Sequence, residues 1–215
     1  MLLAFVLAVL APLSPQSGAL TATAKSAPPP SELAPAVQSL LASDSVSVSA
    51  PQPAAALDFW WVKSLPLKGA GGGAPSWQDV EEGTLVGAVR LSADYRDIRG
   101  RVIRPGVYTL RYGIQPANGD HLGVSPFRDF LLLSPAAVDK DPAASGHDGT
   151  IEMSKQAIGG SHPGVWSIDP PVATEPALQL HKTELGHDAV IMQVPTSRSG
   201  AALKFGVVLV GKIEA

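Results

Sequence analysis

The sequence predicts a mainly β protein, an antiparallel β-sandwich of the jelly-roll or Ig-like type with two short helices. Apolar stretches whose hydrophobic residues alternate with period two recur along the chain, which is typical of strands with one buried face. The 21 glycines and 20 prolines among 215 residues predict many turns and few long helices. The chain has no cysteine and is 45% hydrophobic, so a single core must stabilise it without disulfides.

The N-terminal segment has the features of an export signal. An uncharged apolar run from Leu2 to Leu13 is followed by Ala22-Thr23-Ala24, the small-x-small pattern that signal peptidase accepts. We therefore expect residues 1–24 to be a cleaved signal peptide. Pro12 interrupts the apolar run well before the roughly 20 residues that a transmembrane helix needs. We therefore expect no transmembrane anchor.

A spacer and one domain are expected to follow the signal. Residues 25–33 contain three consecutive prolines in "KSAPPPSEL", which favour an extended polyproline conformation. Residues 34–215 are then long enough to fold as a single β-sandwich domain. An exported chain without cysteines suits the bacterial periplasm or exterior, so we expect a periplasmic or secreted protein.

The first part of the domain is predicted to contain one helix and three strands. In "SELAPAVQSLLAS", Ser31 can cap a short helix whose apolar side carries Leu33, Val37, Leu40 and Leu41. The stretches "VSVSA", "LDFWWVKSLPL" and "GTLVGAVRLSADY" have the composition and alternation of strands. The glycine-rich "GAGGGA" predicts a surface loop, because no phosphate-loop lysine follows it.

A β-hairpin is expected at "RGRVIRPGVYTLRYGI". Pro105 and Gly106 suit the two central positions of a type II turn, and both flanks have strand-like composition. The next expected strand, "DFLLL", is continuously apolar, which indicates burial on both faces.

The remaining chain is predicted to form a helix and four strands. "HDGTIEMSKQAIGG" predicts a helix that Asp148 or Thr150 caps and Gly159-Gly160 ends. "GVWSIDPP" predicts a short strand closed by prolines. A meander of three further strands is expected at Leu178–Thr183, Ala189–Val194 and Leu203–Lys212.

Candidate binding residues gather just before "DFLLL". Asp120, His121, Arg128 and Asp129 lie within ten residues, in a stretch too polar for a strand. A loop at the end of a rigid sheet is a common place for a binding site, so we take these four as the candidate binding residues. Structural roles stay open: Asp120 can accept backbone N–H bonds in a turn, and Arg128 and Asp129 can pair with partners across the sheet.

A metal site is a second hypothesis for the same loop. The five histidines show no local ligand spacing such as His-x-His or His-Glu-x-x-His, so separate loops would have to supply the ligands. His121 and His162, together with Asp120, would suit zinc or another first-row metal. Ser125 stands in "GVSPF", which lacks the last glycine of a nucleophile elbow. The sequence names no cofactor and leaves open whether the protein is an enzyme.

Five arginines surround the expected hairpin. They are Arg96, Arg99, Arg101, Arg104 and Arg111. Guanidinium groups can hold carboxylates or anionic sugars, but charges also keep an edge hairpin soluble. Asp94 and Asp97 lie in the same stretch and can neutralise part of this charge. We therefore favour the solubility role and leave the anion site as the alternative.

The central block "DYRDIRGRVIRPGVYTLRYGIQPANGDHLGVSPFRDFLLLSPA" resembles the central block of exported bacterial β-sandwich proteins that belong to a domain of unknown function. The shared feature is the x-x-Pro-Gly-x-Tyr-x-Leu hairpin, and the block covers about a fifth of the chain. The resemblance implies a fold and a compartment. It implies no catalytic residue.

These observations favour an exported, non-enzymatic binding or structural module of the bacterial envelope. A formal net charge of −3 gives no reason to expect nucleic acid or an anionic membrane as partner. We expect a monomer whose ligand is a small molecule or an envelope component. The alternative is a metal-binding protein or a metal-assisted hydrolase, with a site built from the 115–129 loop and His162.

Overall fold

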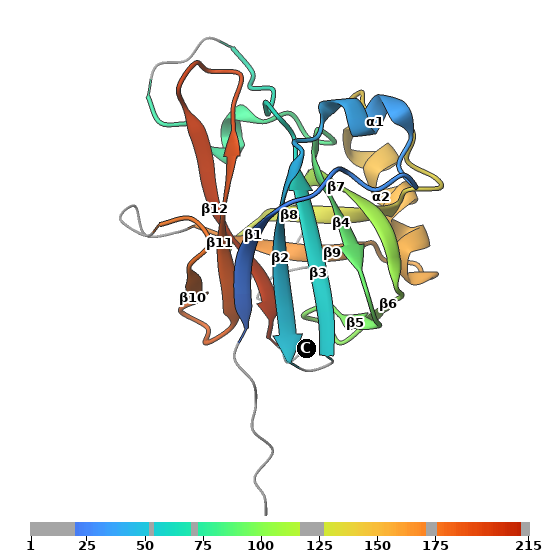
Figure 1. Cartoon of the computed structure of the whole chain (residues 1–215). Coiled ribbons are helices and arrows are strands. Elements are labelled where there is room, and N and C mark those ends of the chain that lie inside the picture. Colours follow the sequence, from blue (N-terminus) through green and yellow to red (C-terminus); the bar gives the residue numbers. More distant parts are fainter. Residues whose placement is uncertain (1–19, 52–53, 70–72, 117–126, 171–175, 212–215) are drawn as a thin grey trace, which may run out of the picture.

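The computed structural model describes residues 20–51, 54–69, 73–116, 127–170 and 176–211. It is mainly β, with antiparallel sheets and two α-helices (Figure 1), which confirms the predicted fold class at this level. The described strands are β1 (Thr21–Ser26), β2 (Asp44–Pro51), β3 (Ala54–Trp61), β4 (Leu85–Leu91), β5 (Tyr95–Arg96), β6 (Val102–Ile103), β7 (Gly106–Ile114), β8 (Asp129–Pro135), β9 (Gly164–Asp169), β10 (Leu180–Lys182), β11 (Asp188–Pro195) and β12 (Ala202–Val210). The helices are α1 (Pro35–Leu40) and α2 (Gly146–Ile158), with a 3-10 turn, η1, at Trp77–Asp79.

Ten of these strands form one sheet in the order β1-β2-β3-β4-β7-β8-β9-β12-β11-β10, while β5 and β6 pair separately. Hydrogen bonds join each of the ten strands to the next, so the strands form one sheet rather than clearly a sandwich of two sheets. This sheet curls on itself and is nearly closed and barrel-like (Figure 1). Leu65, after β3, also forms a parallel bridge with Thr196, after β11. This bridge connects two parts of the curled sheet that are distant in strand order.

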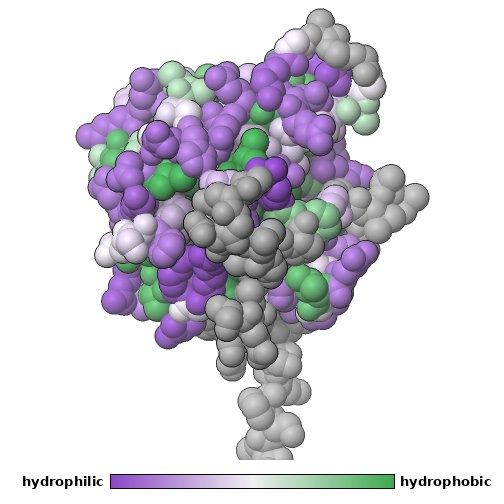
Figure 2. Space-filling model, turned by 180° about the vertical axis from the view of Figure 1, so that it is seen from behind, coloured by the Kyte–Doolittle hydropathy of each residue, from purple (hydrophilic) through white to green (hydrophobic). Residues whose placement is uncertain are grey.

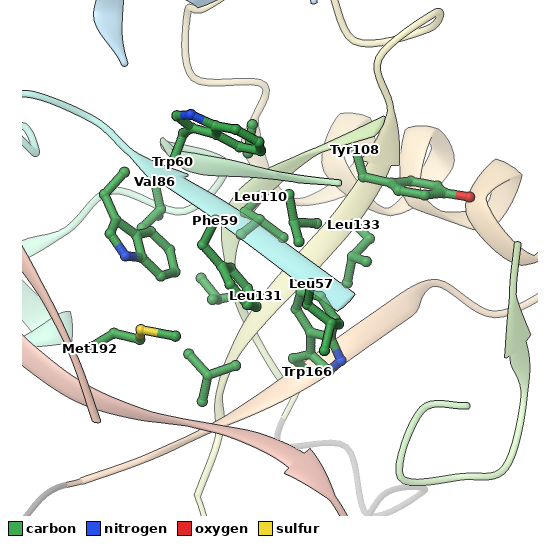
Figure 3. Packing of buried hydrophobic residues seen from close by; sticks show 14 of the residues in the cluster. Leu57, Phe59, Trp60, Val86, Tyr108, Leu110, Leu131, Leu133, Trp166 and Met192 are labelled. Carbon is green, nitrogen blue, oxygen red and sulfur yellow. The ribbon is translucent and has the colours of Figure 1, made fainter. Parts of the chain in front are cut away.

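Aromatic side chains fill the space inside the curled sheet. Trp61 of β3 and Phe205 of β12 meet edge to face with ring centroids 5.4 Å apart, although β4, β7, β8 and β9 lie between their strands in the sheet. The ring centroid of Trp166, on β9, lies 5.4 Å from the ring centroid of Phe59. Figure 3 shows Trp166 and Met192 reaching toward Phe59 from other strands of the wall. Burial of these large rings is a principal driving force for closure of the sheet.

The period-two pattern predicted most strands correctly because one face of each strand packs on this core. Phe59 and Trp61 share the inner face of β3, as expected from alternation. All five central residues of β8 are buried, since β7 and β9 flank the strand and α2 packs against it. The C-terminal meander is also confirmed, with β10, β11 and β12 paired in order.

The predicted hairpin around Pro105 and Gly106 is wrong. β6 and β7 do not pair with each other: β6 pairs with β5, and β7 pairs with β4 and β8. Gly106 itself begins β7 opposite Leu91. The turn that closes a hairpin lies earlier, at residues 97–100, where Gly100 has φ +75°. The long strands on both sides offer β7 a far more extensive ladder than two-residue β6 could.

Both predicted helices are present, with different N-terminal caps. α1 is only six residues long and begins after Ala34 rather than Ser31, and Val37 is its buried residue. α2 begins after Ser145 and ends at Gly159, whose φ of +63° is the left-handed conformation of a glycine C-cap. None of the helices among the described residues is long and apolar enough to cross a membrane.

The N-terminal edge strand overlaps the expected signal cleavage site. β1 pairs with β2 along six residues, from Thr21 opposite Ser49 to Ser26 opposite Asp44, and Leu20 before it is buried. Cleavage after Ala24 would remove the first four residues of this strand. The cleavage position stays a prediction, and β1 is a reason to measure it.

Candidate functional site

A pocket of about 280 Å³ lies on the outer face of the sheet, between α2 and the strands β7, β8 and β9. Its floor is apolar because Phe130 and Leu132 of β8 alternate outward and Val165 of β9 lies opposite Leu132. Ile151 of α2 and Ile98 of the β5–β6 turn also line it. A concave, largely apolar site with a few polar groups is the usual form of a small-molecule pocket.

Gly113 shapes the floor of this pocket. A Cβ atom at this position would lie 2.3 Å from Cδ1 of Leu132, so the absence of a side chain lets Leu132 lie across β7. Leu132 is 5% exposed in this position. An alanine at position 113 would therefore push the end of the Leu132 side chain toward the open space above the floor.

A histidine–carboxylate pair stands at one side of the pocket. Nδ1 of His147, in the first turn of α2, lies 2.7 Å from Oε1 of Glu82. The same oxygen accepts the backbone N–H of Ile114 at 3.0 Å. Glu82 therefore ties the start of α2 to the end of β7, and it fixes the ring of His147 at the wall of the pocket.

Two arginines of the β5–β6 turn form another part of the wall, where Arg99 and Arg101 both line the pocket. Asp97 organises this turn, because its Oδ1 accepts the backbone N–H groups of Arg99 at 3.0 Å and of Arg101 at 2.9 Å. Its Oδ2 lies 3.4 Å from Nε of Arg101. Burial lowers the pKa of Arg101 from its ordinary value, although the charge of Asp97 acts in the opposite direction.

A buried ion pair holds the chain that leads into α2. Arg111 on β7 and Asp139 are each 1% exposed, and Nε of Arg111 lies 2.6 Å from Oδ2 of Asp139. The guanidinium also donates to the carbonyl oxygens of Gly83, Asp141 and Ala143. Arg111 thus fastens the segment between β8 and α2 to the sheet, which keeps α2 over the pocket.

The structure places three of the five sequence-predicted site residues, while Asp120 and His121 lie outside the described residues. His162 lies in the exposed turn between α2 and β9 and lines the pocket. Arg128 is exposed and donates to the carbonyl of Gln115 at 2.8 Å. Asp129 accepts the hydroxyl hydrogen of Tyr112 at 2.6 Å. His162 and Gln115 line the same pocket, whereas Arg128 and Asp129 contact the end of β7.

Sequence reasoning did not assign Glu82 or His147 to a site, and it named Arg99 and Arg101 only within the alternative anion site of the arginine cluster. The arginine cluster was the one signal in the sequence that pointed to any of these pocket residues, and its members occupy different environments in the structure. Arg99 and Arg101 face the pocket, and Arg111 is buried on Asp139, whereas exposed Arg104 pairs with Asp94 at 2.8 Å. Glu82 and His147 are 65 residues apart and carry no sequence pattern that joins them.

The metal hypothesis finds no ready-made ligand group in the part of the chain that the structure describes. Among those residues, no group of three or more His, Cys, Asp or Glu side chains is placed to hold a metal ion. The expected ligands Asp120 and His121 are not within that part.

The chain was compared with protein-family models, with curated proteins and with solved structures, and no match was found in any of the three. The site must therefore be interpreted from its own geometry.

Proposed function

We propose that this protein is an exported, non-enzymatic binding module of the bacterial envelope, and that its ligand is a small molecule held in the pocket under α2. The observation that carries the proposal is the pocket itself: an apolar floor of Phe130, Leu132 and Val165, with charged groups only on the walls. Such a lining is typical of sites that bind small molecules by burying an apolar body.

The surface that the figures show is consistent with a small ligand. On the face in Figure 2, hydrophilic residues dominate and hydrophobic residues form small, separate patches. A stable protein interface normally has a larger apolar centre. The pocket under α2 offers apolar contact without such a surface.

Several further expectations accompany this proposal. We propose a periplasmic or secreted monomer that is released from a signal peptide of residues 1–24 and folds as a single domain. We also keep the jelly-roll or Ig-like sandwich as the finer description of the fold, together with kinship to the exported bacterial proteins that the central block resembles.

A neutral probe tests the pocket. 3-Phenylpropanol has about ten non-hydrogen atoms, and at roughly 0.4 kcal/mol per atom it should bind with a dissociation constant of about 1 mM. In ¹H–¹⁵N NMR titrations, we expect its shifts to centre on amides of β7, β8, β9 and α2. Gly113→Ala should weaken this binding severalfold because the added Cβ pushes the end of Leu132 into the space above the floor that the ligand would occupy.

The control is Gly186→Ala, since Gly186 has no atom within 4 Å of an added Cβ and does not line the pocket. Its titration should match that of the wild type. Shifts that do not centre on the pocket, or a titration that Gly113→Ala leaves unchanged, would contradict the proposal.

A metal-binding protein or metal-assisted hydrolase is the second candidate function, with a site built from the 115–129 loop and His162. One observation favours it: His162 and Gln115, the first residue of that loop, line one pocket together with His147. Thermal melts with and without Zn²⁺ test this candidate. A zinc-dependent rise in melting temperature that His162→Ala abolishes would support it, and no zinc effect on the wild type would count against it.

A further inference from the structure

The charges on the wall of the pocket indicate which small molecules it selects. We infer that the ligand is a monocarboxylate with a short apolar body, whose carboxylate is held by Arg99 and Arg101. This inference rests on the proposed function, because it specifies the ligand of the same pocket. The evidence for this ligand is which of the charged side chains around the pocket already have hydrogen-bond or ion-pair partners within the protein, and which do not.

The pocket wall carries three cationic side chains and one carboxylate: Arg99, Arg101, Lys155 and Glu82. Glu82 is already engaged by His147 and by the backbone of Ile114. Nζ of Lys155 lies 2.5 Å from Glu152, one turn earlier in α2. The kind of ligand that the pocket accepts therefore depends on Arg99 and Arg101 of the β5–β6 turn, and on which partners their guanidinium groups already have.

Asp97 cannot satisfy both arginines. One of its oxygens accepts two backbone N–H groups of the turn, and the other lies 3.4 Å from Nε of Arg101 without a hydrogen bond of ordinary geometry. Nε and Nη1 of Arg101 are shielded from solvent and have no hydrogen-bond partner among the described residues. Within the same part of the chain, no hydrogen bond or ion pair engages the guanidinium of Arg99, although its backbone N–H is bonded to Asp97.

Within the β5–β6 turn, the guanidinium charges of Arg99 and Arg101 stand beside the single carboxylate of Asp97, which leaves a local surplus of one positive charge. That surplus matches a monoanion better than a dianionic phosphate. A carboxylate also suits the site chemically, because guanidinium groups present planar pairs of N–H donors that match its two oxygens. The partial burial of Arg101 reduces screening by water and so strengthens such a contact.

The position of the arginines fixes the orientation of the ligand. Arg99 and Arg101 belong to the β5–β6 turn, whereas Phe130, Leu132 and Val165 form the floor. A ligand whose carboxylate meets the turn therefore lays its apolar body on β8 and β9 under Ile151. The limited volume of about 280 Å³ favours a body the size of a phenyl group or a short alkyl chain.

Three probes of one shape test this inference: 3-phenylpropionate, 3-phenylpropanol and 3-phenylpropylammonium, titrated at pH 7 and low salt by NMR. The carboxylate should bind about tenfold more tightly than the alcohol because it gains charge-assisted hydrogen bonds. The ammonium compound should bind more weakly than the alcohol. Arg99→Gln should remove most of the advantage of the carboxylate over the alcohol.

Arg104→Gln is the matched control. Arg104 follows shortly after Arg101, but it is exposed, pairs with Asp94 and does not line the pocket, although both arginines border a neighbouring hollow. This variant should keep the preference for the carboxylate. A second test variant, Arg101→Gln, should reduce the preference as Arg99→Gln does, and its thermal melt shows whether it is folded.

The outcomes separate the two proposals. Equal binding of the carboxylate and the alcohol in the pocket would overturn the anion inference and leave the pocket proposal standing. The absence of binding by all three probes would overturn both. An equal loss of preference in Arg104→Gln and Arg99→Gln would show a general effect of positive charge, which would also overturn the assignment to Arg99 and Arg101.

Discussion

Replacement of Asp139 by alanine should be among the most destabilising single changes in this protein. Asp139 is 1% exposed and accepts Nε of Arg111 at 2.6 Å and Nη2 at 2.8 Å. It also accepts the hydroxyl hydrogen of Thr109. The alanine variant would leave the charge of Arg111 buried without its counterion.

The magnitude follows from the bonds that are lost and those that remain. Removal of one partner of a buried ion pair costs about 3–5 kcal/mol. Arg111 would keep its bonds to three carbonyl oxygens, and Thr109 would keep the carbonyl of Ser134 at 3.3 Å. We therefore expect the lower end of that range, about 3 kcal/mol, which is a large part of the roughly 5–15 kcal/mol that stabilises a typical domain.

Urea denaturation followed by circular dichroism measures this loss. Asp139→Asn should lie between the wild type and Asp139→Ala, because the amide keeps one acceptor but turns an N–H donor toward the guanidinium. Arg104→Ala breaks an exposed pair with Asp94 and should change the free energy of unfolding by less than about 1 kcal/mol. A loss below about 1 kcal/mol in Asp139→Ala, with an unchanged m-value, would refute the reasoning.

Three further predictions concern other parts of the fold. Gly83→Ala should cost clearly more than Gly186→Ala in urea denaturation: both glycines have positive φ, but only at Gly83 would an added Cβ lie 2.4 Å from a backbone atom, the nitrogen of Gly146. Burial raises the pKa of Tyr95 above its ordinary value of 10.0, so the unfolded chain loses this proton first and stability should fall as the pH rises above about 10. Tyr95→Phe should make that fall less steep, and an unchanged slope would contradict the assignment. A chain that starts at residue 25 should melt at a lower temperature than one that starts at residue 20, because it lacks four residues of β1; equal melting temperatures would show that β1 is dispensable.

The strands and α2 could be predicted because their information is local. Alternating apolar residues in "LDFWW" and "GVYTLRYGI" place one face of each strand on a core, whatever their neighbours are. Gly159 ends α2 because a glycine adopts the left-handed conformation without strain. The absence of cysteine likewise determined that packing, rather than disulfides, stabilises the chain.

Strand partners and the pocket were decided by the tertiary structure. The Pro105-Gly106 motif suited a hairpin locally, but β7 gains two long ladders with β4 and β8, and the sum of those pairings outweighs one turn. Glu82 and His147 meet only because the sheet brings β7 beneath the start of α2. No local pattern distinguishes Arg99, Arg101 and Arg111 in the sequence. In the structure, the geometry of the β5–β6 turn places Arg99 and Arg101 at the pocket, whereas alternation along β7 places Arg111 against Asp139. Contacts between residues far apart in the chain depend on the closed sheet as a whole, which is why no local pattern could assign them.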